Sequence, residues 1–230
     1  IGKRGFGWPF GNNQDLLRNL EGGKIAWIYN WSPYQISVSN AEFVPMIWSS
    51  KKGLDANEFF EQVKDAKVVL GFQEPDSASQ SNMSPVEAAQ AWQIFLEPLR
   101  ARGIRLGSPA ITSTDTGLLW MSEFLEELNK IDCHIDFLVL HWYGRSVDNF
   151  IDWITLAHTR FGDEYPIWIT EFACASFDSN QVISQEEVNA FMQESITKLE
   201  SLSWIERYAW FGFDFGEAKD RKSTRLNSSH

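Results

Sequence analysis

Two glutamates of this 230-residue chain stand where a strand-like apolar run gives way to polar sequence. Glu74 ends the run in "VVLGFQEPD" (residues 68–76) and precedes Pro75, and Glu171 follows the apolar run of "PIWITEF" (residues 166–172). Because proline cannot donate to a strand ladder, we expect Glu74 at a strand end. A strand-end glutamate can equally be a solvated turn residue, so neither carboxylate alone predicts chemistry.

A third strand-like run, "FLVLHWYG", carries His141 and Tyr143. Residues two apart on a strand share a face, so we expect these two side chains to point the same way. His141 can bond a substrate, a catalytic carboxylate or its own surroundings. Polar or aromatic residues at the ends of the predicted strands are our candidate substrate-binding residues: Asn30, Trp48, Gln73, His141, Trp142, Tyr143 and Trp210. The tryptophans among them can also be core residues.

Paired carboxylates beside aromatic rings favour the hydrolysis of glycosidic bonds. One carboxylic acid protonates the leaving oxygen, and the other carboxylate stabilises or attacks the anomeric centre. Tryptophan rings suit the apolar faces of sugars. This chemistry needs no cofactor, and we expect no metal site, because His134 and His158 lie in a turn and a helix away from the glutamates.

Eight short apolar runs alternate with segments of helical period. The helical segments over residues 84–103 and 184–202 each open with serine followed three residues later by glutamate, which predicts a capping box. Strand-helix alternation indicates parallel strands and crossover helices, and eight strands predict an α/β fold, the (β/α)8 TIM barrel. An open doubly wound sheet is the alternative. The predicted strands occupy residues 4–10, 24–31, 42–49, 68–74, 104–110, 136–144, 165–173 and 206–213.

The composition limits the classes of binding partner. The length of the chain fits one domain, which we place over residues 1–219. The net charge of −11 argues against a nucleic-acid-binding surface, which would be basic. No apolar run is long enough to cross a membrane. Residues 220–230, "DRKSTRLNSSH", read as the translation of a sequencing adapter, so we treat them as non-native and expect the last barrel helix to be missing. Cys133 and Cys174 fall at opposite ends of the predicted barrel and are expected to be free.

Five motifs together resemble a known family: "GFQEPD", "SNMSPVEAAQAW", "GSPAIT", "HIDFLVLHWYG" and "IWITEF". They are similar to glycoside hydrolase family 128, whose members are secreted β-1,3-glucanases with a (β/α)8 barrel. The resemblance runs from about Lys3 to Phe213. It implies a monomeric, extracellular or cell-wall enzyme that acts on β-1,3-glucan, and we expect endo action.

The resemblance also implies roles for single residues. Glu74 matches the general acid/base and Glu171 the nucleophile of a retaining hydrolase. Tyr143 matches a tyrosine that bonds the nucleophile, and Trp210 an aromatic residue under the sugar being cleaved. Gln73 departs from the family, which usually carries asparagine there to bond the substrate 2-hydroxyl. A non-catalytic β-glucan-binding protein therefore stays open as an alternative. A hydrolase of another β-linked polymer, such as β-mannan or β-1,4-glucan, also stays open, because the residues of the reaction centre do not set the choice of linkage.

Overall fold

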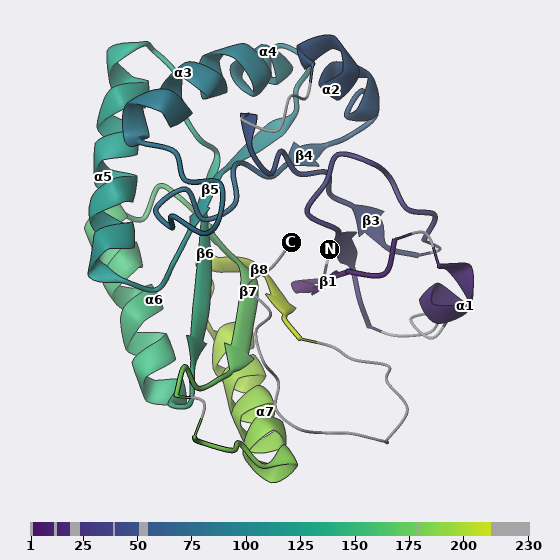
Figure 1. Ribbon diagram of the computed structural model, residues 1–230, viewed down its shortest axis with the longest axis vertical. Helices are drawn as coiled ribbons and strands as arrows, with labels where there is room; N and C mark the ends of the chain where they lie inside the picture. Colours follow the sequence, from purple (N-terminus) through teal and green to yellow (C-terminus); the bar gives the residue numbers. More distant parts are fainter. Residues whose placement is uncertain are drawn as a thin grey trace.

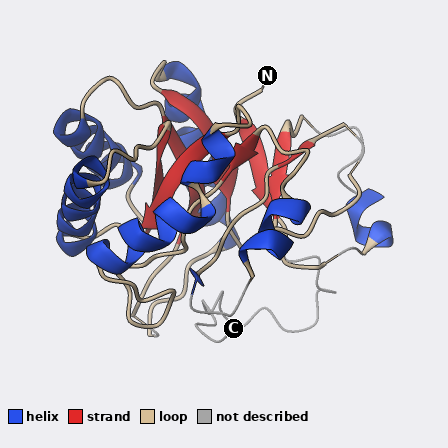
Figure 2. Cartoon of the chain, turned by 90° about the horizontal axis from the view of Figure 1, so that it is seen from above, coloured by secondary structure: helices blue, strands red, loops and turns tan. Residues whose placement is uncertain are grey.

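Eight parallel strands form the centre of the molecule, as the sequence predicts (Figure 1; Figure 2, red). The computed structural model describes residues 2–11, 13–18, 24–38, 40–50, 55–178 and 180–212. The sheet order is β3-β2-β1-β8-β7-β6-β5-β4. The strands are β1 (Arg4–Gly7), β2 (Trp27–Tyr29), β3 (Glu42–Phe43), β4 (Val68–Val69), β5 (Arg105–Ile111), β6 (Phe137–Gly144), β7 (Ile167–Cys174) and β8 (Ile205–Trp210).

Backbone hydrogen bonds join the two ends of this sheet just beyond β3 and β4. The Leu70 N–H donates to the Pro45 carbonyl at 2.9 Å, and the Ile47 N–H donates to the Leu70 carbonyl at 3.1 Å. Met46 and Leu70 form a parallel bridge at the same place. The sheet therefore curls round on itself as a (β/α)8 barrel, and the open doubly wound alternative is wrong.

Helices pack around the outside of the strands. In Figure 1 the helices α2 to α7 form an arc around β4 to β8, whereas α1 lies beside β1 to β3. Both predicted capping boxes are present, at Ser84 with Glu87 and at Ser184 with Glu187. The helices are α1 (Gln14–Leu17), α2 (Ala56–Gln62), α3 (Pro85–Phe95), α4 (Glu97–Arg100), α5 (Asp115–Lys130), α6 (Val147–Phe161) and α7 (Gln185–Ser201).

Two layers of apolar side chains hold the barrel together. Inside it, the ring of Trp168 packs on Trp27 at 5.2 Å and on Phe137 at 4.3 Å between centroids. Gly5 is required there, because a Cβ atom at this position would come within 2.0 Å of the Trp27 ring. Outside it, a larger cluster between sheet and helices includes the fully buried Trp92. Side chains thus fill the barrel interior, so any ligand must bind at an end of the barrel.

Further predictions concern the two cysteines, membrane-spanning segments and the end of the chain. Cys133 and Cys174 are both buried and free, as expected. Within the described ranges, no helix has the length and apolar character needed to span a bilayer. The predicted last helix and the tail over residues 220–230 lie outside the described residues.

Candidate active site

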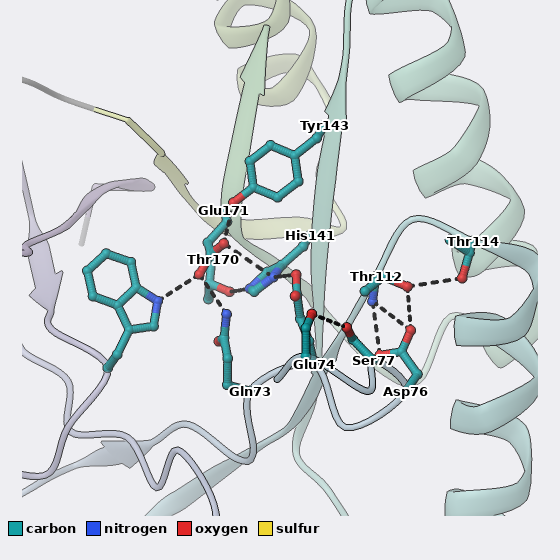
Figure 3. A network of polar contacts seen from close by, with 12 residues as sticks. Gln73, Glu74, Asp76, Ser77, Thr112, Thr114, His141, Tyr143, Thr170 and Glu171 are labelled. Carbon is teal, nitrogen blue, oxygen red and sulfur yellow. Dashed lines mark hydrogen bonds and ion pairs between the residues drawn. The ribbon is translucent and has the colours of Figure 1, made fainter. Parts of the chain in front are cut away.

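Glu74 lies five residues beyond the end of β4 and directly after Gln73, which forms a parallel bridge with Ala110 of β5, in a tight turn at the carboxyl end of the barrel. Its backbone is left-handed, with a φ of 38°, a conformation that costs a non-glycine residue about 1–2 kcal/mol. The turn is fixed by its own backbone, since the Ser77 N–H donates to the Glu74 carbonyl at 3.0 Å and the Met83 N–H to the Pro75 carbonyl at 3.0 Å. Asp76 ties the turn to the end of β5 by accepting from the Thr112 N–H at 3.2 Å (Figure 3).

Glu171 lies on β7 at an irregularity that changes the direction of the strand's side chains. The pairing with β6 passes from Leu140 opposite Ile169 to His141 opposite Glu171, so Thr170 has no partner in the register. Such a bulge allows two consecutive side chains to face the same side of a sheet. Thr170 and Glu171 both point into the barrel mouth, where Glu171 is 3% exposed.

Four hydrogen-bond donors from three strands and their loops converge on the Glu171 carboxylate. Its Oε1 atom accepts from three of them, namely Trp31 Nε1 at 2.7 Å, Gln73 Nε2 at 3.0 Å and the Tyr29 hydroxyl at 3.4 Å. Its Oε2 atom accepts from the Tyr143 hydroxyl (Figure 3). The two oxygens are thus held by different sets of donors, and the carboxylate has one fixed orientation.

Both tyrosines stay protonated and can act only as donors at ordinary pH. Burial, followed by the charge of Glu171, raises the pKa of Tyr29 and of Tyr143 well above the ordinary value of 10.0. The Tyr29 hydroxyl shares its single proton between the Thr170 carbonyl at 3.0 Å and Glu171 Oε1 at 3.4 Å. A phenol that does not ionise remains a hydrogen-bond donor.

His141 lies between the two glutamates and contacts both. Its Nδ1 atom is 2.8 Å from Glu74 Oε1 and 3.5 Å from Glu171 Oε2, and its Nε2 atom is 2.9 Å from Thr170 Oγ1. Burial, the largest influence, lowers the pKa of His141, but the charges of Glu171 and Glu74 and the bond to Glu74 outweigh it and raise the pKa above 6.5. The ring therefore presents an Nδ1–H to the carboxylates.

A carboxylate oxygen of Glu74 lies within 4.8 Å of one of Glu171, and His141 lies within the same distance of both. Among the described residues, Glu74, His141 and Glu171 form the group whose carboxylate oxygens and imidazole nitrogen lie close enough together to hold a metal ion. The imidazole nitrogens already face Glu74 and Thr170, so the arrangement is complete as a hydrogen-bonded network. Two facing carboxylates at this separation suit general acid/base and nucleophilic work at a single carbon atom.

Residues 5–229 match a protein family described as glycosyl hydrolase catalytic core. The chain belongs to this family. This catalytic core is also 36% identical over 216 residues to alkali-sensitive linkage protein 1 of Schizosaccharomyces pombe, a match that covers 91% of the chain. The chain spans 38% of the length of that curated relative.

Solved structures of glycoside hydrolase family 128 share the fold of this catalytic core, as the sequence motifs predict. A curdlan-specific exo-β-1,3-glucanase from Blastomyces gilchristii, in complex with glucose, is 36% identical, with a TM-score of 0.77 over 91% of this chain and 89% of that one. An endo-β-1,3-glucanase from Amycolatopsis mediterranei, in complex with laminaritriose, is 30% identical, with a TM-score of 0.78 over 91% and 88%.

The glycosyl hydrolase core brings five of the nine predicted site residues into one network. Each is joined to another by a contact described above, and they come from the ends of β4, β6 and β7. Whether they act in catalysis or in substrate binding stays a prediction. These residues are Gln73, Glu74, His141, Tyr143 and Glu171.

The prediction that Trp142 lines the site is wrong. Its ring packs outward, at 4.9 Å from the Phe150 ring of α6 and 5.7 Å from the Phe191 ring of α7. The physical reason is the alternation of strand side chains, because His141 and Tyr143 on either side of it point inward. Trp142 is a core residue of the hydrolase.

The position predicted for Trp210 is also wrong, by one residue. Trp210 packs outward on Phe172 at 5.3 Å and on Phe191 at 6.1 Å. The next residue, Phe211, turns inward and contacts the rings of Trp31 at 5.9 Å and Tyr143 at 5.5 Å. A shift of one position exchanges the two faces of a strand, so Phe211 is the strand-eight aromatic residue beside the carboxylates.

Asn30 and Trp48 lie in the loops that follow β2 and β3. The Asn30 amide donates to the Tyr34 carbonyl at 3.0 Å and accepts from the Ser32 hydroxyl at 3.0 Å, so these contacts shape its own loop. Trp48 is half-buried, and its carbonyl accepts from the Gln73 N–H at 3.0 Å. Substrate binding by either side chain stays a prediction.

Three residues of the network were not among the predicted site residues: Tyr29, Trp31 and Thr170. The alternation in "WIYNW" (residues 27–31) is a signal for the first two, because Trp27, Tyr29 and Trp31 fall on one face. Successive rings of this set contact one another at 5.7 and 4.9 Å. Thr170 depends on the bulge in β7, for which the sequence carries no comparable signal.

Proposed function

We propose that this hydrolase cleaves β-1,3-glucan with retention of configuration, with Glu74 as acid/base and Glu171 as nucleophile. The observation that carries the proposal is the pair of carboxylates, with oxygens within 4.8 Å of one another, in the segment after β4 and on β7. Retaining hydrolases hold their carboxyl groups about 5–5.5 Å apart, whereas inverting enzymes leave about 6.5–9.5 Å for a water molecule.

The surroundings of the two side chains support different roles. Glu171 accepts hydrogen bonds from four donors, which suits a carboxylate that attacks as an anion. Glu74 is the more exposed of the pair, with 12% of its side chain accessible against 4% for Glu171. The His141 bond engages Glu74 Oε1, so Oε2 remains to carry a proton toward the leaving oxygen.

The reaction would proceed in two displacements. Glu171 forms a bond to the anomeric carbon while the glycosidic bond breaks, and the departing oxygen takes the Glu74 proton. Glu74 then removes a proton from water, whose oxygen attacks the same carbon and releases Glu171 with its electron pair. Two inversions at one carbon restore the original configuration.

The similar enzymes support β-1,3-glucan as the substrate. The Amycolatopsis enzyme was crystallised with laminari-oligosaccharides after either of two glutamates was replaced by alanine. Those two glutamates are separated in its sequence by the same number of positions as Glu74 and Glu171 are here. The agreement supports the assignment of the pair and of the substrate class.

Endo action is the finer part of the proposal. The similar structures include endo-β-1,3-glucanases from Amycolatopsis mediterranei and Sorangium cellulosum and exo-β-1,3-glucanases from Blastomyces gilchristii and Aureobasidium namibiae. The size of the first products decides between the two modes, since endo cleavage gives a mixture of oligosaccharides and exo cleavage gives one short product. The monomeric state and secretion implied by the resemblance belong to the same proposal.

The test is the release of reducing ends from a soluble β-1,3-glucan by the chain and by Glu171→Ala. We expect release by the wild type, loss of release in the variant, and a β-anomer as the first product in proton NMR. A panel of β-mannan and β-1,4-glucan run beside it tests the alternative polymers. Binding to β-1,3-glucan without release by the folded wild type would instead identify a non-catalytic glucan-binding protein.

A further inference from the structure

Trp31 directs its polar edge, and not only its ring, at the carboxylates, as Tyr29 and Tyr143 do with their hydroxyl groups. Its Nε1–H donates to Glu171 Oε1 at 2.7 Å, the shortest of the three contacts to that oxygen atom. A hydrogen bond from a neutral N–H to a carboxylate is stronger than one between neutral groups. The indole therefore contributes directly to the placing of this carboxylate.

The fold around Trp31 is shaped to hold the ring in this place. The residue has a left-handed backbone, with a φ of 56°, which is rare for a bulky side chain. A Cβ atom at Gly7 would come within 2.9 Å of the Trp31 ring, so only glycine leaves room on β1. The rings of Tyr29 and Phe211 contact the indole at 4.9 and 5.9 Å and fix its plane. Strained residues of this kind cluster at functional sites.

The two oxygen atoms of Glu171 have different surroundings, which suggests a different function for each. Oε2 lies on the side of Glu74, because His141 Nδ1 is close to both of them, at 3.5 Å and 2.8 Å. A sugar bound between the carboxylates would meet Oε2 first. Oε1 accepts from Trp31 Nε1 and Gln73 Nε2, which lie beyond the ends of β2 and β4, whereas Oε2 accepts from the Tyr143 hydroxyl.

We infer that Trp31 is a positioning residue whose indole N–H, with the Gln73 amide, holds Oε1 of Glu171 so that Oε2 attacks the anomeric carbon. This inference rests on the proposed function. In the covalent intermediate Oε1 would be the carbonyl oxygen of the glycosyl ester. When the ester bond breaks, its electron pair returns to the carboxylate, and the two N–H groups stabilise the negative charge that reappears on Oε1.

The first test separates this role from sugar stacking. Trp31→Phe keeps an aromatic face and removes the N–H donor together with one of the two fused rings, a loss of ring area that the control variant below shares. We expect kcat on β-1,3-glucan to fall about 10–10²-fold while KM stays within about twofold, since the lost bond acts on the reacting groups. A rise in KM with unchanged kcat would show a stacking platform and overturn the inference, as would wild-type kinetics.

Trp92→Phe is the matched control. The Trp92 indole also donates to a glutamate carboxylate, Glu97 Oε2 at 3.3 Å, but it lies on α3 outside the barrel. This control shows how the loss of an indole–carboxylate hydrogen bond affects folding when the bond lies away from the active site. We expect kcat and KM of folded Trp92→Phe to match the wild type. An equal fall in kcat in both variants would show that the Trp31 effect is structural.

The second test does not depend on the substrate. We expect one indole N–H resonance that is absent in Trp31→Phe and shifted in Glu171→Gln, while the resonance absent in Trp92→Phe is unchanged in Glu171→Gln. If no indole resonance responds to Glu171→Gln, the bond is absent and the inference fails. A wild type that cleaves no β-glucan would end the proposed function, and this spectrum would still decide whether Trp31 holds Glu171.

Discussion

The Nδ1 atom of His141 lies 2.8 Å from Oε1 of Glu74, at the distance of a hydrogen bond to a charged group. The same atom is 3.5 Å from Glu171, so one imidazole serves both carboxylates. The ring is 1% exposed, and its far nitrogen contacts Thr170. His141 is thus the part of the network that links the two catalytic candidates electrostatically, and its protonation state affects both.

The raised pKa of His141 predicts a pH-dependent contribution to stability. The imidazolium is favoured in the folded state, so its contribution is fully present below the unfolded value of about 6.5 and is lost as pH rises through the folded pKa. We expect His141→Gln to lower the free energy of unfolding by about 1.5–3 kcal/mol in acid, the value of a hydrogen bond to a charged group. The difference from the wild type should shrink in alkaline solution, as measured by urea unfolding.

His134→Gln is the control for this measurement, because His134 is exposed at the opposite end of β6. It measures the effect of the same substitution on the free energy of unfolding at an exposed position. A His141→Gln difference that grows as the pH rises would contradict the prediction, since that sign belongs to a histidine favoured in its neutral form.

The assignment of Glu74 as acid/base predicts that the effect of its loss depends on the leaving group. Glu74→Gln removes the proton donor but keeps the volume and the hydrogen-bond acceptor. We expect hydrolysis of β-1,3-glucan to fall by about 10²–10⁴-fold, the usual contribution of general acid catalysis. An aryl β-glucoside whose phenol needs no proton should lose much less in its first step.

Glu171→Gln provides the contrast, because a nucleophile is needed whatever the leaving group. It should lose activity on both substrates. Equal losses of kcat/KM on the two substrates in Glu74→Gln would show that Glu74 is not the acid, because kcat/KM reports the first step of the reaction.

The strands and the two carboxylates could be predicted because their signals are local. Apolar runs that lead into Glu74 and Glu171 mark the carboxyl halves of two strand segments without knowledge of the fold, although β7 continues past Glu171 to Cys174 and β4 already ends at Val69. Once the strands are parallel, their carboxyl ends must lie at the same end of the barrel, which is why the five residues of the network meet.

The face on which a side chain lies was harder to predict. Trp142 could have been placed outward from the alternation with His141 and Tyr143 alone. Glu171 breaks the same rule, because the bulge at Thr170 turns two consecutive residues inward. The left-handed backbone of Trp31 is a further case, since it depends on the close packing of β1 against the ring.

The outward packing of Trp142 and the inward packing of Phe211 predict different effects for two substitutions. Trp142→Ala should lower the free energy of unfolding by about 3–5 kcal/mol, as for other buried tryptophans, with kcat/KM of the folded fraction unchanged. Phe211→Ala should change stability less and lower kcat/KM, because Phe211 contacts Trp31 and Tyr143. Chemical unfolding and kinetics on both variants test this; loss of kcat/KM in folded Trp142→Ala would return that residue to the site.

Gln73 stands where related hydrolases usually carry asparagine, directly before the acid/base glutamate. Its backbone is fixed on both sides, by the Trp48 carbonyl at 3.0 Å and the Ser81 N–H at 3.1 Å. Only the length of the side chain brings its amide to 3.0 Å from Glu171 Oε1. Gln73 Oε1 is buried without a hydrogen-bond partner, which leaves it free to accept from a sugar hydroxyl.

We therefore expect Gln73→Asn to lower kcat/KM about tenfold, the effect of about 1.4 kcal/mol of lost transition-state stabilisation. The shorter amide cannot reach Glu171 from this backbone, so the bond is lost and the carbonyl withdraws from the sugar. Gln90→Asn, on the exposed face of α3, makes the same chemical change away from the site and should leave the kinetics unaltered. If Gln73→Asn were as fast as the wild type or faster, the contact with Glu171 would contribute nothing to the rate, and the asparagine of related hydrolases would be the better residue at this position.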